Sequence, residues 1–358
     1  MRRFAALALA LGLAGSLTAC GMRPADPDTA QESIQVIAMD TVMIFKVYGE
    51  KSTHAAYLAE DEVRRLEGLL SRTDADSQIY ALNNAGGQPV TVDGEVLRLL
   101  DTAGLYSEAT GGAFDVSVAP VVSAWGFTED SCRVPAQAEL EELLTHVGVE
   151  HVHAQSGDSA WLDEGTQIDL GGIAKGYATD RIAEILKENG IPRATISLGG
   201  NVLAWGDRPD GEPWLVGIQD PGRPDEEAYV GGLRLEDGLA VTSGGYQRYF
   251  EQDGKTYHHI IDPSDGYPAD SGLVSVTVVA DCSRESADGL PGKGTMCDAL
   301  STALFVMGEE KALDFWRNSG YDFDLVLVTE DGRVVVTDGV ADRFTFDETG
   351  GYSYETVS

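Results

Sequence analysis

Nine residues from Asp169 to Tyr177, Asp-Leu-Gly-Gly-Ile-Ala-Lys-Gly-Tyr, place an acid, a pair of glycines and a lysine at the expected start of a helix. Gly171 and Gly172 lack a Cβ atom, so a ligand can approach the backbone closely there. The N–H groups of a first helical turn attract an anion, and Lys175 adds a positive charge beside them. The spacing fits neither a P-loop nor the dinucleotide fingerprint, and a tight turn with one solvated lysine is the plainer alternative.

Two neighbouring histidines are the second candidate for chemistry. His258 and His259 lie in an expected strand, where successive side chains point to opposite faces. One of them can therefore face a pocket while the other faces the core or solvent. A histidine in a pocket suits a general base near neutral pH. A pair of structural or surface histidines is the plainer alternative, and a zinc site from two adjacent strand residues is not expected.

A third candidate is the pair Asp298 and Thr302, which share one face of an expected helix at the spacing i, i+4. A carboxylate and a hydroxyl are oxygen ligands that suit Mg²⁺, which takes few protein ligands and shares the rest with substrate phosphates. The alternative is an N-cap aspartate with a threonine that points inward.

The first twenty residues predict the compartment. An apolar segment from Phe4 to Leu17 follows two arginines and ends in Leu17-Thr-Ala-Cys20, which resembles a lipobox. We expect a lipoprotein signal peptide over 1–19, lipidation of Cys20 and a lipid-anchored tether over 20–33. The protein would then be extracytoplasmic and anchored to the bacterial cell membrane. An ordinary signal peptide with a chance cysteine is the alternative.

The charge balance excludes one class of partner. The chain has 25 basic and 59 acidic residues and a formal net charge of −34. Nucleic acid and anionic membrane surfaces would be repelled, and an anionic substrate would need a metal ion or local positive charge. Cys282 and Cys297 could close a disulfide in an oxidising compartment, leaving Cys132 free. A metal site built from the cysteines is not expected, because the chain has no CxxC pair.

The elements that must position these residues come in groups of helices and groups of strands, which favours an α+β fold over a doubly wound parallel sheet. Helices are expected at 58–70, 79–83, 96–106, 135–147, 173–189, 298–307 and 313–316. Strands are expected at 33–48 (interrupted at 38–41), 152–162, 167–170, 195–198, 214–218, 240–243, 255–262, 274–280, 323–329 and 334–337. Asp331-Gly332 between the last two strands is a hairpin signal, and 283–295 reads as a Gly/Ser-rich insertion.

Seven motifs in order resemble the FAD:protein FMN transferase family, the ApbE-type flavin transferases, from about Ile37 to Val336. They are Ala38-Met-Asp-Thr41, Thr110-Gly-Gly-Ala-Phe-Asp115 with Trp125-Gly-Phe127, the stretch Asp169–Tyr177, Ser197-Leu-Gly-Gly-Asn201, Thr242-Ser-Gly244, His259-Ile-Ile-Asp-Pro263 and Asp298-Ala-Leu-Ser-Thr302.

The resemblance implies an α+β fold of antiparallel sheets with packed helices, similar to the T-fold. The transferase domain would cover 34–345 and a C-terminal tail 346–358. It also implies a reaction: with Mg²⁺, FAD is split at its pyrophosphate, AMP leaves, and FMN is joined to a threonine or serine hydroxyl of a target protein. The target implied is an extracytoplasmic flavoprotein subunit of a membrane redox complex.

Site residues follow from the resemblance position by position. Residues placed to contact FAD are Met39, Thr73, Ala113, Phe114, Asp115, Asp169, Lys175 and Ile260. Asp298 and Thr302 would bind Mg²⁺ by their side chains, a backbone carbonyl near Gly172 would complete the metal site, and His259 would be the general base. Three positions depart from the family pattern: Thr73 replaces an aromatic residue that stacks on the flavin in some members, Gly245 a commonly polar residue, and Ser301 an acid of certain relatives.

Two other functions remain open from the sequence. A Mg²⁺-dependent FAD pyrophosphatase would release free FMN and AMP, differing only in that water attacks in place of a protein hydroxyl. A lipoprotein that binds flavin without chemistry would show no turnover at all.

Overall fold

The computed structural model describes residues 30–127, 131–154, 157–282 and 292–358 of the 358-residue chain. The expected signal peptide, Cys20 and most of the tether lie outside the described residues, as does most of the 283–295 insertion. Helices and largely antiparallel sheets confirm the α+β class. Among the described helices, none is both long and apolar enough to cross a membrane.

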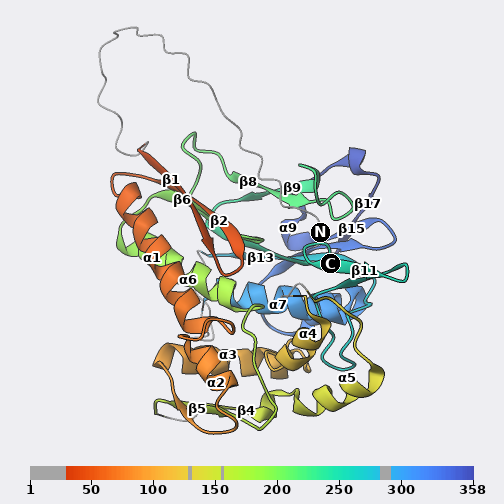
Figure 1. Ribbon diagram of the computed structural model, residues 1–358. Coiled ribbons are helices and arrows are strands. Elements are labelled where there is room, and N and C mark those ends of the chain that lie inside the picture. The colour runs from red at the N-terminus through yellow and green to blue at the C-terminus, as the bar shows by residue number, and fades with distance from the viewer. Residues whose placement is uncertain (1–29, 128–130, 155–156, 283–291) are drawn as a thin grey trace.

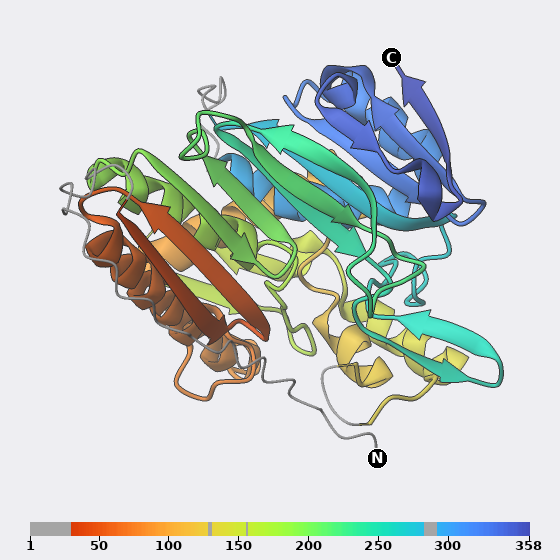
Figure 2. The same cartoon turned by 90° about the horizontal axis from the view of Figure 1, so that it is seen from above.

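The centre of the described part is a nine-stranded sheet that runs across the whole molecule (Figure 2). Its strands, in spatial order, are β1 (Gln31–Ala38), β2 (Thr41–Tyr48), β6 (Arg193–Leu198), β7 (Asn201–Trp205), β10 (Gly238–Gly244), β13 (Leu273–Asp281), β14 (Asp324–Thr329), β15 (Arg333–Thr337) and β17 (Ser353–Val357). Neighbours pair antiparallel except β15 and β17, which pair parallel.

Three helices cover one face of this sheet: α1 (Ser52–Leu70), α6 (Ala174–Glu188) and α7 (Lys293–Met307), which lie side by side in Figure 1. The α1 helix buries Ala55, Ala59, Val63, Leu66 and Leu70, a stripe at helical spacing that turns it onto the sheet. The α7 helix is buried on nearly all sides, because α6, the sheet and α8 (Glu309–Asn318) surround it. The main hydrophobic core lies between these helices and the sheet.

Smaller units complete the described part. The opposite sheet face is covered by β8 (Trp214–Gln219), β9 (Tyr229–Leu235) and β16 (Phe344–Phe346), which enclose a second core with β10, β13 and β14. Below α1 lie α2 (Gln78–Asn83), α3 (Gly94–Ala109) and the small sheet of β3 (Val90–Thr91), β5 (Ser159–Leu162) and β4 (Val152–Ala154) (Figure 1). The hairpin of β11 (Tyr249–Gln252) and β12 (Lys255–His258) packs with α4 (Ala119–Trp125) and α5 (Gln137–Leu143) around Trp125.

The stretch 33–48 forms a hairpin, whereas one interrupted strand was expected. Met39 and Asp40 sit at its turn with φ of 48° and 57°, so both adopt the left-handed conformation of a two-residue turn. Neither residue is glycine, which is why the turn signal was weak in the sequence. The turn reverses the chain and brings Met39 against α1, where its N–H donates to Glu67 Oε1 at 2.7 Å.

Several expected boundaries are wrong. Residues 167–170 make a single bridge, between Gln167 and Val118, and do not form a strand. The strand expected at 255–262 ends at His258, and α7 begins five residues before Asp298. Strands β7, β9 and β11 were not anticipated: two glycines interrupt the apolar pattern of β9, and β11 is short and largely exposed. Cys282 and Cys297 are free thiols in this structure.

The C-terminal segment 346–358 is part of the fold rather than a tail. It contains a short 3₁₀ turn, Glu348–Gly350, and the strand β17, which extends the central sheet beside β15. The side chain of Tyr354 packs on Phe344 and Phe346.

Candidate active site

One cavity of about 1210 Å³ gathers the site residues that the sequence predicts. Its lining includes Met39, Thr73, Ala113, Phe114, Asp115, Asp169, Gly172, Lys175, His259, Ile260, Asp298 and Thr302. They come from the β1–β2 turn, the loops after α1 and α3, the start of α6, α7, and the loop after β12. Cys20 lies outside the described residues, so its lipidation stays a prediction.

Helix α6 begins close to the residue that the sequence predicts, but the anion at its N-terminus is a side chain of the protein itself. The helix has Ile173 as its N-cap, with no capping side chain, and the N–H of Gly176 in its first turn donates to Asp298 Oδ2 at 2.8 Å. Lys175 Nζ donates to the Gly171 carbonyl at 3.0 Å and lies 3.8 Å from Asp298 Oδ1. The carboxylate of Asp298 therefore occupies the positive helix end.

Asp298 and Thr302 stand on the inner face of α7, with Asp298 only 3% exposed. Asp298 follows Gly292, the N-cap, by six residues, so the N-cap alternative for Asp298 is wrong. Thr302 Oγ1 lies 3.2 Å from Ser243 Oγ, and an added Cβ on Gly172 would be 3.5 Å from the same hydroxyl. A carboxylate, two hydroxyls and the Gly172 backbone thus converge on one side of the cavity.

These donors are hard oxygen atoms, so the chemistry of the set fits Mg²⁺. Asp298 Oδ1 is beyond hydrogen-bond length from Lys175 and so keeps lone pairs for a cation. The described residues contain no cluster of three or more His, Cys, Asp or Glu side chains able to hold a metal. A cation here would therefore need further oxygen ligands from a substrate. Ser301, the departure from relatives with a second acid, donates to the Asp298 carbonyl at 2.9 Å.

The two adjacent histidines have different surroundings, as expected, although His259 lies just past the end of β12. His258 Nε2 lies 3.1 Å from the Ala269 carbonyl, and its Nδ1 accepts the N–H of Ile260 at 3.3 Å. Both ring nitrogens of His258 are therefore used inside the protein. His259 lines the cavity, and its Nδ1 lies 3.2 Å from the Arg248 carbonyl. With the proton on Nδ1, Nε2 carries the free lone pair of a base.

The protein around His259 keeps its imidazole neutral. Loss of hydration, followed by the positive charge of Arg248, lowers the pKa of His259 to about 4. The imidazole is therefore unprotonated at neutral pH and able to accept a proton.

Sequence reasoning missed two cations and at least two acids, Glu67 and Asp225, of the cavity lining. Among the described residues, the cations lining it are Arg72, Arg248 and the predicted Lys175. Arg72 lies 3.2 Å from Asp169 Oδ2, and an Arg248 guanidinium N–H donates to the Asp40 carbonyl at 3.2 Å. The chain has far more acidic than basic residues, so a basic residue near one of the seven motifs was a candidate for contact with an anionic substrate.

The remaining predicted residues shape the walls. The carboxylate of Asp115 accepts hydrogen bonds from the backbone and hydroxyl of Ser117 and from the hydroxyl of Ser107, which fixes the loop after α3. Phe114 and Ile260 are buried apolar walls. Thr73 is exposed, with its hydroxyl 3.2 Å from that of Ser71. The structure supplies no aromatic ring at position 73 for a flavin to stack on.

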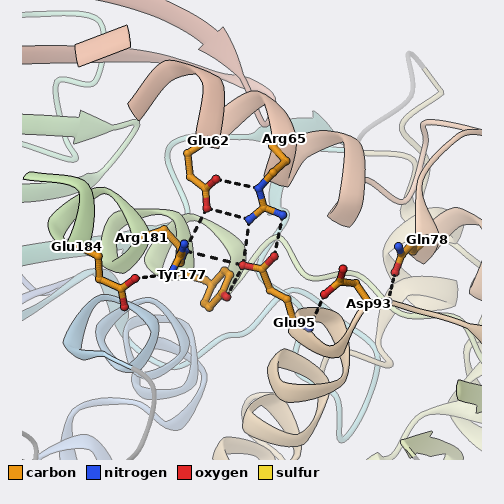
Figure 3. A network of polar contacts seen from close by, with 8 residues as sticks. All are labelled: Glu62, Arg65, Gln78, Asp93, Glu95, Tyr177, Arg181 and Glu184. Carbon is orange, nitrogen blue, oxygen red and sulfur yellow. Dashed lines mark hydrogen bonds and ion pairs between the residues drawn. The ribbon is translucent and has the colours of Figure 1, made fainter. Parts of the chain in front are cut away.

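A network of charged side chains ties α6 to α1 and α3 close to the site (Figure 3). Arg65 on α1 pairs with Glu62 and Glu95, and Tyr177 on α6 donates to Glu95 at 2.5 Å. Arg181, one turn further along α6, bonds Glu62 at 3.1 Å. The pairing lowers the pKa of Glu62, chiefly through its hydrogen bond with Arg65, so Glu62 is ionised at neutral pH. Tyr177 is two residues from Lys175, so the network fixes the helix end that faces the cavity.

Comparison with known proteins identifies the family. The sequence profile of the ApbE family matches residues 39–326. The chain is 33% identical to an FAD:protein FMN transferase of Klebsiella pneumoniae, covering 90% of this chain and 97% of the relative, and 35% identical to that of Treponema pallidum, covering 86% and 87%.

Solved structures agree with the sequence relatives. The ApbE protein of Thermotoga maritima superposes with a TM-score of 0.75 at 35% identity, covering 89% of this chain and 98% of its own. The Pseudomonas stutzeri flavinyl transferase ApbE gives 0.74 at 27% identity, covering 88% and 97%. With its motifs gathered around one cavity and most of its length matched, the chain belongs to the ApbE family.

Proposed function

We propose that this protein is a Mg²⁺-dependent FAD:protein FMN transferase that modifies a threonine or serine of an extracytoplasmic flavoprotein subunit of a membrane redox complex. The observation that carries the proposal is that His259, the buried Asp298 and the half-buried Thr302 line one and the same cavity. The names of the curated relatives support the same activity.

The chemistry assigned to the residues is phosphoryl transfer. The acceptor hydroxyl oxygen attacks the phosphorus of the FMN half of FAD, and the bond from that phosphorus to the bridging oxygen breaks, so AMP leaves with the bridging oxygen. His259 takes the hydroxyl proton on Nε2, while its Nδ1–H stays on the Arg248 carbonyl. Lys175 and Arg248 place positive charge beside the reacting phosphates.

Asp298 and Thr302, with a backbone carbonyl near Gly172, would hold the metal. Bound there, Mg²⁺ supplies the positive charge that a diphosphate substrate requires in a protein with so few cations. The Gly176 N–H at the α6 helix end orients the Asp298 carboxylate.

The location of the reaction follows from the N-terminal prediction. Lipidation at Cys20 and a short tether would hold the transferase at the outer side of the cell membrane, within reach of a membrane-bound acceptor. Mass spectrometry of the membrane-extracted protein tests this: the N-terminal peptide should begin at Cys20 and carry acyl chains.

The decisive experiment is the intact mass of a candidate acceptor domain after incubation with this protein, FAD and Mg²⁺, with AMP quantified alongside. A gain of one FMN less water with matching AMP supports the transferase. AMP without a mass gain on two different acceptors would make the protein an FAD pyrophosphatase. Neither product would leave a flavin-binding lipoprotein and overturn the proposal.

A further inference from the structure

We propose that Asp180 is a positioning residue for the metal site, because it caps helix α7 from the neighbouring helix α6 and so fixes where Asp298 stands. The inference rests on the proposed function in taking Asp298 as a metal ligand. Asp180 lines no part of the cavity and carries none of the roles assigned above.

The first observation is that α7 lacks a cap of its own. Its N-cap is Gly292, which has no side chain to accept the first N–H groups of the helix. Asp180 takes that place: its Oδ1 accepts the N–H of Gly294 at 2.7 Å, and its Oδ2 accepts the N–H of Thr295 at 2.8 Å. These are the second and third helical positions, the ones an N-cap side chain normally serves. The Thr295 hydroxyl donates to the same oxygen at 2.6 Å.

The second observation is how tightly the two helices meet at this point. An added Cβ on Gly176 would lie 2.2 Å from the Gly294 carbonyl oxygen and 2.6 Å from the Cβ of Asp298. The backbones are therefore in direct contact, with the Gly176 N–H on the Asp298 carboxylate. Asp180 and Gly176 are one turn apart on α6, as Asp298 and Gly294 are on α7. The Asp180 cap and the Gly176–Asp298 contact lie one turn apart. Together they fix the distance between α6 and α7 and the rotation of α7 about its own axis.

The consequence concerns the geometry of a metal ligand rather than the integrity of the fold. The large core around α7 would hold the helix in place without Asp180. Its first two turns would lose their anchor, and the Asp298 carboxylate would no longer be held at the bond to Gly176. Residues that orient a metal ligand are worth about 10- to 100-fold in metal affinity.

The test compares Asp180→Asn and Asp180→Ala with the parent protein. In Asp180→Asn, the amide nitrogen is a donor and cannot accept a hydrogen bond. It would therefore leave one of the two backbone N–H groups that donate to the carboxylate without an acceptor. Two quantities are measured: the Mg²⁺ concentration that gives half-maximal AMP release, and the rise in Tm that Mg²⁺ causes in the absence of FAD. We expect the first to increase about tenfold or more and the second to shrink, while the KM for FAD at saturating Mg²⁺ stays unchanged.

Asp347→Asn is a matched control. Asp347 accepts hydrogen bonds from the N–H and hydroxyl of Thr349 at 2.9 and 2.6 Å, as Asp180 does from those of Thr295, but it caps the short turn Glu348–Gly350, which carries no residue of the site. Thr295→Val is a second test variant that removes only the hydroxyl donor and keeps both backbone contacts, which guards against a variant that does not fold. It should give a smaller shift in the same direction.

A Mg²⁺ requirement and a Mg²⁺-induced Tm rise equal to those of the parent protein in folded Asp180 variants would overturn the inference. Failure of the parent protein to release AMP or transfer FMN would instead overturn the proposed function. The Tm measurement would still decide the role of Asp180, because it needs metal but no turnover.

Discussion

His258 and His259 are neighbours in sequence, yet only His259 faces the cavity with a nitrogen to spare. The strand β12 ends at His258, whose ring nitrogens both face partners within the protein. His259 is held by one nitrogen to the Arg248 carbonyl. The hydrogen-bonding partner therefore decides which histidine can act as a base. Strand alternation indicates only that one of the two can, and the family resemblance is what singled out His259.

Replacing His259, the candidate base, should reduce FMN transfer without weakening FAD binding. His259→Gln removes the proton acceptor, so FMN transfer should fall about 10²- to 10⁴-fold, while the affinity for FAD changes little because an amide keeps the polarity of the wall. The transfer rate is read by intact mass and the affinity by titration of flavin fluorescence. His54→Gln, on an exposed face, is the control. Undiminished transfer by His259→Gln would place the base on another residue.

The low pKa of His259 also predicts a pH dependence. Its folded pKa of about 4 lies below the ordinary value of 6.5, so the unfolded chain binds more protons between these pH values. Stability should therefore fall as pH drops from 6.5 to 4 and level off below. We expect about 1–2 kcal/mol, a discounted value because the ring borders a solvent-accessible cavity.

Two measurements check this pH dependence. Urea unfolding of the parent protein and His259→Gln between pH 4 and 7 should show the extra slope in the parent alone. The acid limb of kcat/KM for transfer should lie well below pH 6.5. A limb at 6.5 would mean that the imidazole is hydrated like a surface histidine.

The buried carboxylate of Asp298 should be indispensable for metal-dependent turnover. Asp298→Ala removes the one carboxylate of the candidate metal site, so AMP release at low Mg²⁺ should nearly disappear and should recover only in part at high Mg²⁺. Enzyme assays across a Mg²⁺ series, with Asp347→Ala as the control, measure this. Unchanged release at low Mg²⁺ would refute the assignment of Asp298 as a ligand.

At the scale of elements, the contact between α6 and α7 depends on the absence of a side chain at Gly176. An alanine there would meet the Gly294 carbonyl and the Cβ of Asp298 at distances that real Cβ atoms do not adopt. Gly176→Ala should therefore push the helices apart and lower the free energy of unfolding by about 1–3 kcal/mol. It should also raise the Mg²⁺ requirement, because the Gly176 N–H moves away from Asp298.

Gly68→Ala is the matched control for that change. Gly68 is also inside a helix, α1, but an added Cβ there meets no atom within 4 Å. Helix propensity alone should then stabilise the protein by about 0.5–1 kcal/mol. Thermal unfolding of both variants measures the contrast. Equal effects at the two glycines would show that the helix contact is looser than the structure has it.

The sequence predicted the helices better than the turns and caps that place the site. Apolar spacing revealed α1, α3 and α6 because one face of each is buried. The left-handed turn at Met39 and Asp40 carries no glycine, and the cap of α7 comes from Asp180 on another helix, so neither has a local signal. Arg72 and Arg248 reach the cavity only through tertiary contacts, which no spacing in the sequence reports.

At the scale of the whole molecule, the cavity lies where separate parts of the chain meet, which is why family motifs located its residues better than periodicity did. Motifs some 260 residues apart in sequence, at the β1–β2 turn and on α7, line the same walls. The strands at the far end of the sheet, β15 and β17, contribute nothing to the lining. The far end of the sheet is thus separate from the strands that line the cavity. A change there should lower the free energy of unfolding and leave FAD binding and the Mg²⁺ requirement unaltered.

Removing residues 352–358 tests that separation. The truncation deletes β17, and with it the parallel pairing to β15, the packing of Tyr354 on Phe344 and Phe346, and the hydrogen bond from the Tyr352 hydroxyl to Asp220. Five cross-strand pairs at about 0.2–1 kcal/mol each predict a loss of about 1–5 kcal/mol in the free energy of unfolding. FAD affinity and the Mg²⁺ requirement should stay as in the full chain, since none of the deleted residues lines the cavity. Urea unfolding and FAD titration measure the two effects, and Tyr354→Ala should reproduce part of the loss. An unchanged unfolding midpoint would mean that the segment is a dispensable tail, whereas a loss of FAD binding would mean that the far end of the sheet supports the cavity directly.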